Sequence, residues 1–362
     1  MVLRRLRVAI LPLLLVAAAL PLTWGQSAPS PDAPPVSTVP ADNSPALAPR
    51  ETLHVTSNLV SEYFTVRDKH NALIPYLTKN DCSVFEDKLP QKLTSFVAEA
   101  NQPLTLGILI DTSGSQQYVL PLEKQSADAF LKRVLRPKDE AFVVSFDVGV
   151  NLEQDFTNNT HELEQAINAV QINTAAGGGS VGVPGIGEGP IPTQGAPKGT
   201  LLYDAVYQVS NDKMRSETGR KALILLTDGE DEGSVTKPRA AIAAAENANA
   251  IIYVILIADR GFYFGGGYPL GGYTGDMQMR ALTEATGGRV INVGNNGKKL
   301  EDAFDQIEEE LRTQYLVQYV PKNNEMNGQF RRVDVFCKDQ SEDLKVQARK
   351  GYFAVPDDSD DQ

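Results

Sequence analysis

Short apolar runs alternate with longer segments of helical periodicity through the middle of the chain. Apolar runs of this length, flanked by polar residues, are typical of strands buried on both faces of a parallel sheet. They occupy residues 104–110, 141–146, 222–226 and 251–257. The segments with helical periodicity occupy residues 120–135, 201–209, 239–249 and 300–311. Alternation of strands and helices over about 210 residues predicts a doubly wound α/β domain with a mostly parallel sheet.

Shorter β-favouring segments flank this region on both sides. They occupy residues 53–66, 83–87 and 93–97 before it, and residues 315–320, 330–337 and 344–349 after it. Neither set is long enough for a large sandwich, so we expect the two sets to form one small β domain into which the α/β domain is inserted. The expected boundaries are 51–102 for the first β segment, 103–313 for the α/β domain, 314–355 for the second β segment and 356–362 for an acidic tail.

The first 25 residues have the pattern of an export signal. Arg4, Arg5 and Arg7 precede an apolar run over residues 8–22, and small residues follow it. The alternative is a membrane anchor, but the run is shorter than the roughly 20 residues of a membrane span and contains two prolines. Residues 26–50, rich in Pro, Ser and Ala, predict a disordered linker. We therefore expect a bacterial protein that is exported, either periplasmic or secreted, with no transmembrane segment in the mature chain.

Charge and cysteine content narrow the possible partners and the compartment. The chain has 46 acidic and 34 basic residues, a formal charge of −12, which excludes nucleic acid as a favourable partner. Export implies an oxidising compartment, and the chain has two cysteines, Cys82 and Cys337, one in each β segment. A disulfide between them would contribute roughly 5 kcal/mol through loop closure. The alternative is two separate buried thiols.

Oxygen-bearing side chains follow the predicted parallel strands. Asp111, Ser113 and Ser115 come directly after the first buried strand, and Asp228 follows another. Thr200 precedes a helix that begins near the same edge. Ligands bind outside the carboxyl ends of the strands in such sheets. Carboxylates and hydroxyls are hard ligands that favour Mg²⁺, Mn²⁺ or Ca²⁺ over zinc.

Asp111-x-Ser113-x-Ser115, then Thr200, then Thr227-Asp228-Gly229 resembles the metal-ion-dependent adhesion site of von Willebrand factor type A domains. The resemblance implies that the hydroxyls of Ser113 and Ser115 bind the ion, and that Asp111 and Asp228 act mainly through bound waters. Thr200 would bind directly when a ligand is engaged. It further implies Mg²⁺ as the expected ion, with Mn²⁺ or Ca²⁺ as alternatives, and a protein partner that offers an acidic residue to the metal. Segments such as Val84-Phe85-Glu86-Asp87 and Ala348-Arg349-Lys350-Gly351-Tyr352 also resemble secreted bacterial proteins with a related domain.

Two long glycine-rich loops depart from the usual type A pattern. One lies between Val170 and Thr200, and the other follows the strand that ends near residue 257. The second loop carries aromatic side chains that are candidates for partner binding, namely Phe262, Tyr263, Phe264, Tyr268 and Tyr273. Aromatic loops on a rigid scaffold are good recognition surfaces. The alternative is that both loops are solvated insertions.

The residues favour a binding module over an enzyme. The main rival is a metal-dependent hydrolase, in which a bound ion would activate water. The chain has three histidines, His54, His70 and His161, and none lies in a motif element that could supply a general base. A third possibility is a scaffold in which the metal only stabilises the fold. We expect a protein that is not an enzyme and that binds a partner in a cation-dependent manner.

Overall fold

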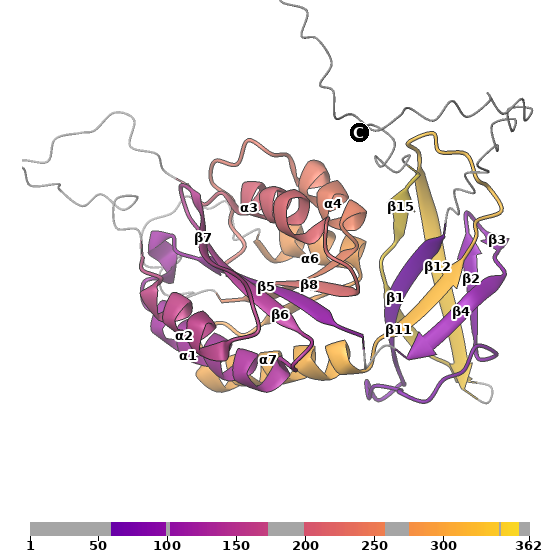
Figure 1. Cartoon of the computed structure of the whole chain (residues 1–362), viewed down its shortest axis with the longest axis horizontal. Helices are drawn as coiled ribbons and strands as arrows, with labels where there is room; N and C mark the ends of the chain where they lie inside the picture. The colour runs from indigo at the N-terminus through magenta and orange to yellow at the C-terminus, as the bar shows by residue number, and fades with distance from the viewer. Residues whose placement is uncertain (1–58, 99–101, 173–198, 258–274, 340–341, 355–362) are drawn as a thin grey trace, which may run out of the picture. The chain divides into compact units, whose positions relative to one another are not determined.

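The computed structural model describes residues 59–98, 102–172, 199–257, 275–339 and 342–354 (Figure 1). The expected export signal, the linker, the acidic tail and most of both glycine-rich loops lie outside these ranges.

A six-stranded sheet carries the central part of the chain. Its order is β10-β9-β8-β5-β6-β7. The strands are β5 (Leu104–Asp111), β6 (Glu140–Phe146), β7 (Val150–Thr157), β8 (Arg220–Thr227), β9 (Ala250–Leu256) and β10 (Val290–Asn292). All neighbouring pairs are parallel except β6 and β7, which are antiparallel. The predicted fold class, a doubly wound and mostly parallel α/β sheet, is confirmed.

Helices cover both faces of this sheet (Figure 1). On one face lie α1 (Leu120–Val134), α2 (Thr160–Ala169) and α7 (Gly297–Arg312). On the other lie α3 (Leu202–Val209), α4 (Pro238–Asn247) and α6 (Gly275–Thr286), with the short helix η3 (Ser210–Met214). The single-turn helix η1 (Gly114–Gln116) follows β5. None of the helices in the described ranges has both the length and the apolar character that a membrane crossing requires.

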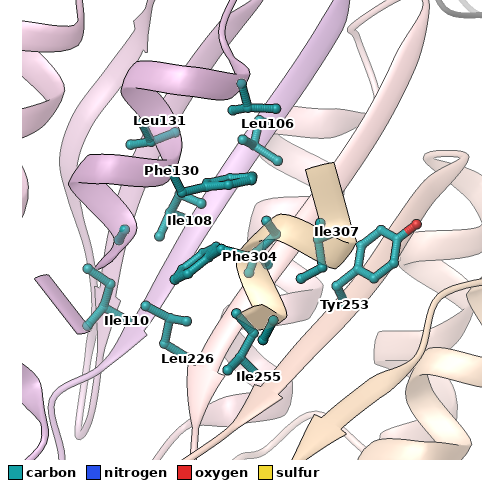
Figure 2. Packing of buried hydrophobic residues seen from close by; sticks show 14 of the residues in the cluster. Leu106, Ile108, Ile110, Phe130, Leu131, Leu226, Tyr253, Ile255, Phe304 and Ile307 are labelled. Atoms are coloured by element: carbon teal, nitrogen blue, oxygen red, sulfur yellow. The ribbon is translucent and has the colours of Figure 1, made fainter. Parts of the chain in front are cut away.

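The strand residues divide between the two faces by the alternation of a pleated strand. Ile108 and Ile110 of β5 pack toward α1 and α7, whereas Leu109 belongs to the core on the opposite face. Figure 2 shows the first of these cores, in which the ring of Phe130 on α1 stacks on Phe304 of α7 with centroids 4.7 Å apart. Both rings are completely buried, so this contact fixes the two helices over the centre of the sheet.

The flanking segments form two smaller antiparallel sheets around a core of their own. One sheet has the order β14-β1-β11-β4, with β14 (Lys345–Ala348), β1 (Val60–Arg67), β11 (Tyr315–Tyr319) and β4 (Leu93–Ala98). The other contains β13 (Glu342–Asp343), β12 (Phe330–Asp339), β2 (Cys82–Glu86) and β3 (Leu89–Pro90), and β15 (Gly351–Phe353) also pairs with β12. Strands from before and after the α/β region therefore pair with one another in both sheets.

A disulfide joins these two parts of the chain. Cys82 of β2 and Cys337 of β12 stand opposite each other in the strand register, with their Cα atoms 4.1 Å apart, and their sulfurs are bonded. The predicted disulfide is therefore present, and the alternative of two separate thiols is wrong. The bond spans 255 positions of sequence, so the whole α/β region lies within the loop that it closes.

Several buried glutamates are neutralised by arginines. The pairs are Arg67 and Arg289 with Glu310 at 2.6 Å each, Arg349 with Glu62 at 2.7 Å, and Arg331 with Glu86 at 3.4 Å. The three carboxylates are at most 2% exposed. An ionised carboxylate in such surroundings requires a positive partner, so the pairs are needed to keep these acids buried.

Candidate metal centre

The predicted site residues lie at the carboxyl ends of two neighbouring strands. Asp111 is the last residue of β5 and Thr227 is the last residue of β8, and these strands pair in parallel register. Asp228 follows Thr227 directly, so the two carboxylates emerge at one edge of the sheet. Asp111 and Thr227 are completely buried and Asp228 is 2% exposed.

Two hydrogen bonds fix the carboxylate of Asp111. Its Oδ1 accepts the backbone N–H of Ser113 at 2.9 Å, and its Oδ2 accepts the hydroxyl of Thr227 at 2.6 Å. The Thr227 hydroxyl in turn accepts the backbone N–H of Gly229 at 3.0 Å. Gly229 has a φ of 82°, and a Cβ there would lie 2.9 Å from the side chains of Leu256 and Met279. Glycine is therefore required to turn the chain beneath the site.

The two serine hydroxyls connect the first strand to the second carboxylate. The hydroxyl of Ser115 donates to Oδ2 of Asp228 at 2.5 Å, and Ser113 Oγ lies 3.0 Å from Ser115 Oγ. The backbone N–H of Glu230 donates to Oδ1 of Asp228 at 3.1 Å. Asp111, Ser113, Ser115 and Asp228 thus form one continuous hydrogen-bonded chain.

Thr200 is brought to the same edge by its backbone. Its carbonyl accepts the N–H of Glu232 at 3.0 Å, and the next residue, Leu201, donates to the carbonyl of Asp147 at the end of β6 at 2.7 Å. A Cβ on Gly199 would lie only 1.8 Å from the carbonyl oxygen of Glu232, so this approach needs glycine. Thr200 is 6% exposed, and within the described residues no hydrogen bond links its hydroxyl to the other four side chains.

The electrostatics of the site favour a cation. Burial and the nearby Asp228 carboxylate raise the pKa of Asp111 to about 7, although hydrogen bonds from Ser113 and Thr227 oppose the rise. A divalent ion would relieve the repulsion between the two carboxylates. Within the described residues no group of three or more His, Cys, Asp or Glu could hold a metal ion. The set here depends instead on hydroxyls and two carboxylates, which are donors that fit a hard divalent cation.

Two polar residues beside the site were not predicted. Glu123 of α1 and Gln116 of η1 are both completely buried. The helical spacing of Glu123 indicates burial, because Glu123 lies on the same face of α1 as Leu120, Ala127 and Phe130. The candidate aromatic residues Phe262, Tyr263, Phe264, Tyr268 and Tyr273 lie outside the described residues, so their role stays a prediction.

Solved structures similar to this chain include type A domains. The von Willebrand factor type A structure from Catenulispora acidiphila is 14% identical, with a TM-score of 0.42, over 78% of this chain and 76% of that one. No protein-family model matches the chain, and no curated protein matches it.

Two further solved structures are similar to part of this chain. BatB from Bacteroides thetaiotaomicron is 14% identical with a TM-score of 0.40, over 57% of this chain and 98% of that one. Proximal thread matrix protein 1 from the mussel byssus, in a form with a zinc-occupied MIDAS motif, is 14% identical with a TM-score of 0.41. The similarity covers 62% of this chain and about half, 49%, of the mussel chain.

Proposed function

We propose that this chain is an exported protein-binding module whose type A-like domain recognises an acidic group of a partner through a divalent cation. The ion would be held by Asp111, Ser113, Ser115, Thr200 and Asp228, and Mg²⁺ is the expected ion. Bound there, the cation supplies a positive centre that accepts an anionic oxygen. The observation that carries the proposal is the hydrogen-bonded chain from β5 to Asp228, in which the Ser115 hydroxyl lies 2.5 Å from the second carboxylate.

The chemistry of this set supports binding of an anion. Two of the five proposed ligand residues carry a carboxylate, and the other three contribute neutral hydroxyls. An ion whose direct ligands are mostly neutral keeps more affinity for a carboxylate from outside than one with carboxylates in place of those hydroxyls.

The positions of the histidines favour binding over hydrolysis. Of the two that the structure describes, His161 lies in the first turn of α2, which follows Thr157 of β7. Thr157 pairs with Ala141 at the amino end of β6, so α2 begins at the opposite edge of the sheet from Asp111. His70 lies in an exposed turn after β1. A hydrolase would need a general base near the attacked group, and neither histidine is available for that role.

Thermal stability tests the metal site directly. The melting temperature of the full chain is measured with Mg²⁺, Mn²⁺ or Ca²⁺ and with a chelator, for the wild type, for Asp111→Ala and for Asp128→Ala. Asp128 is a matched control because it lies on the surface of α1, paired with Lys132. An ion at 100 times its dissociation constant stabilises the folded state by about 2.7 kcal/mol. We expect the ion to raise the melting temperature of the wild type and of Asp128→Ala, and to leave that of Asp111→Ala unchanged.

A second measurement tests the partner chemistry. A fluorescent peptide containing glutamates is titrated into the metal-loaded protein, beside the same peptide with glutamines. Metal-dependent binding of the glutamate peptide alone supports the proposal. If the metal stabilises the protein and neither peptide binds, the ion has only a structural role. If no ion changes the melting temperature of the wild type, the cation-dependent function is refuted.

A further inference from the structure

Glu123 is an acid in the core of the α/β region. It lies in the first turn of α1, and its side chain is completely buried. Neither of its carboxylate oxygens has a hydrogen-bond partner within the described residues. The helix spacing that buries Leu120 and Ala127 also turns Glu123 inward, where an apolar residue is the ordinary choice. Burial of an ionisable group without a partner costs several kcal/mol, so this position needs an explanation.

The other buried glutamates in the described residues have an arginine nearby. Glu62, Glu86 and Glu310 form ion pairs, and Arg349 lies close enough to Glu246 to lower its pKa. Among the described residues, no cationic side chain has such an effect on Glu123. The charges that act on it are the carboxylates of Asp111 and Asp228, and both raise its pKa, in addition to the larger effect of burial. Glu123 is therefore an acid beside two further acids.

A second orphaned acceptor lies in the same part of the chain. The amide oxygen of Gln116 is buried and has no hydrogen-bond partner within the described residues. Gln116 directly follows Ser115, whose hydroxyl its amide nitrogen contacts at 3.5 Å. These buried acceptor oxygens lack a hydrogen-bond donor and lie near the hydroxyls of the candidate metal centre. A bound cation and its water molecules would supply the missing partners.

We propose that Glu123 is a buried countercharge of the cation at the candidate metal centre, acting through space and through metal-bound water rather than as a direct ligand. The inference rests on the proposed function, since it needs an ion at Asp111 and Asp228. Direct ligation is not proposed, because the carboxylates of the described residues do not form a group of three that could hold a metal. The cation takes the place that arginine has beside the other buried glutamates.

This role differs from that of a structural residue in its effect on the metal-free protein. Without the ion, Glu123 is a buried acid with no partner, so its replacement by a neutral isostere should not destabilise the fold. With the ion, the same replacement removes a favourable interaction. A residue outside the ligand set that orients or neutralises a metal site changes metal affinity by about 10- to 100-fold.

The experiment compares Glu123→Gln with the wild type, Asp111→Asn and Glu246→Gln as full-length proteins. Glu246 is a matched control, because it is also a buried glutamate but lies at the end of α4 beside Ala250, at the amino end of β9 and the opposite edge of the sheet. Affinity for Mg²⁺ and Mn²⁺ is measured by calorimetry, and the melting temperature is measured in a chelator. Glu123→Asp is the second variant, which keeps the charge.

We expect Glu123→Gln to bind Mg²⁺ at least tenfold more weakly, with an equal or higher melting temperature in the chelator. Glu246→Gln should bind as the wild type does, and Glu123→Asp should bind more tightly than Glu123→Gln.

An affinity of Glu123→Gln within twofold of the wild type overturns the inference, and so does a weaker affinity that comes with a lower melting temperature in the chelator. If Glu123→Gln does not fold, an affinity of Glu123→Asp no better than that of Asp111→Asn overturns it as well. A wild type that binds no ion refutes the proposed function and this inference together, and the Asp111→Asn comparison identifies that case.

Discussion

Glu246 should make the stability of this protein fall as the pH rises toward neutrality. It lies near the end of α4, is 4% exposed, and has one carboxylate oxygen with no hydrogen-bond partner within the described residues. Burial raises its pKa from 4.5 to about 7, against the opposing effect of Arg349. The folded chain therefore keeps the Glu246 proton at pH values where the unfolded chain has already released it. This contribution to stability is complete below pH 4.5 and is lost as the pH rises through 7.

The change Glu246→Gln removes the titration while it keeps the size of the side chain. Between pH 5 and pH 8 we expect the wild type to lose about 2–3 kcal/mol more unfolding free energy than the variant. Urea denaturation at several pH values in this range measures the two slopes. Other buried acids titrate in both proteins, so only the difference between the slopes reports Glu246. Parallel slopes for the two proteins would refute the reasoning, and a steeper decline in the variant would contradict its sign.

Other changes test the core, the disulfide and the turn at Thr200. Phe304→Ala removes the ring that stacks on Phe130, and we expect the free energy of unfolding, measured by urea denaturation, to fall by about 3–5 kcal/mol. A fall below 1 kcal/mol would mean that the α1–α7 contact is not tightly packed. Replacement of both Cys82 and Cys337 by alanine should lower the free energy of unfolding by about 5 kcal/mol, because the unfolded chain is no longer restricted by the closed loop. A melting curve identical to that of the oxidised wild type would contradict this. Gly199→Ala places a Cβ 1.8 Å from the carbonyl oxygen of Glu232, so the neighbouring Thr200 must move. We expect the affinity for Mg²⁺, measured by calorimetry, to fall at least tenfold. An affinity equal to that of the wild type would show that the Thr200 segment can shift without weakening the site.

Much of the parallel sheet could be predicted from sequence because its strands are buried on both faces. β5 and β8 have no exposed position, so their apolar runs are continuous and easy to recognise. The edge strand β7 gave no comparable signal. Its residues, Val150 to Thr157, include no buried position, and the alternation of Val150, Leu152 and Phe156 is interrupted by Gln154. A half-buried edge strand with so few apolar residues gives a weaker pattern than the buried strands.

The convergence of the candidate site residues was predictable from sequence, whereas the residues around them were harder to predict. Asp111, Ser113, Ser115 and Asp228 follow strand ends, so their convergence depends only on parallel pairing of β5 and β8. Glu123 could not be placed in the same way. Its spacing groups it with the buried residues of α1, but an acid in an amphipathic helix normally faces water, so the spacing alone did not lead to a prediction of burial.

The disulfide determines how mechanical load would pass through this molecule. Because Cys82 and Cys337 are bonded across β2 and β12, tension applied between the two ends of the chain crosses from one strand to the other through the sulfurs. The segment between them, including the six-stranded sheet and the edge that carries Asp111, lies outside this load path. While the bond is intact, the two ends of the chain could be pulled apart without stretching the six-stranded sheet, whereas reduction of the bond would expose the sheet to the full force.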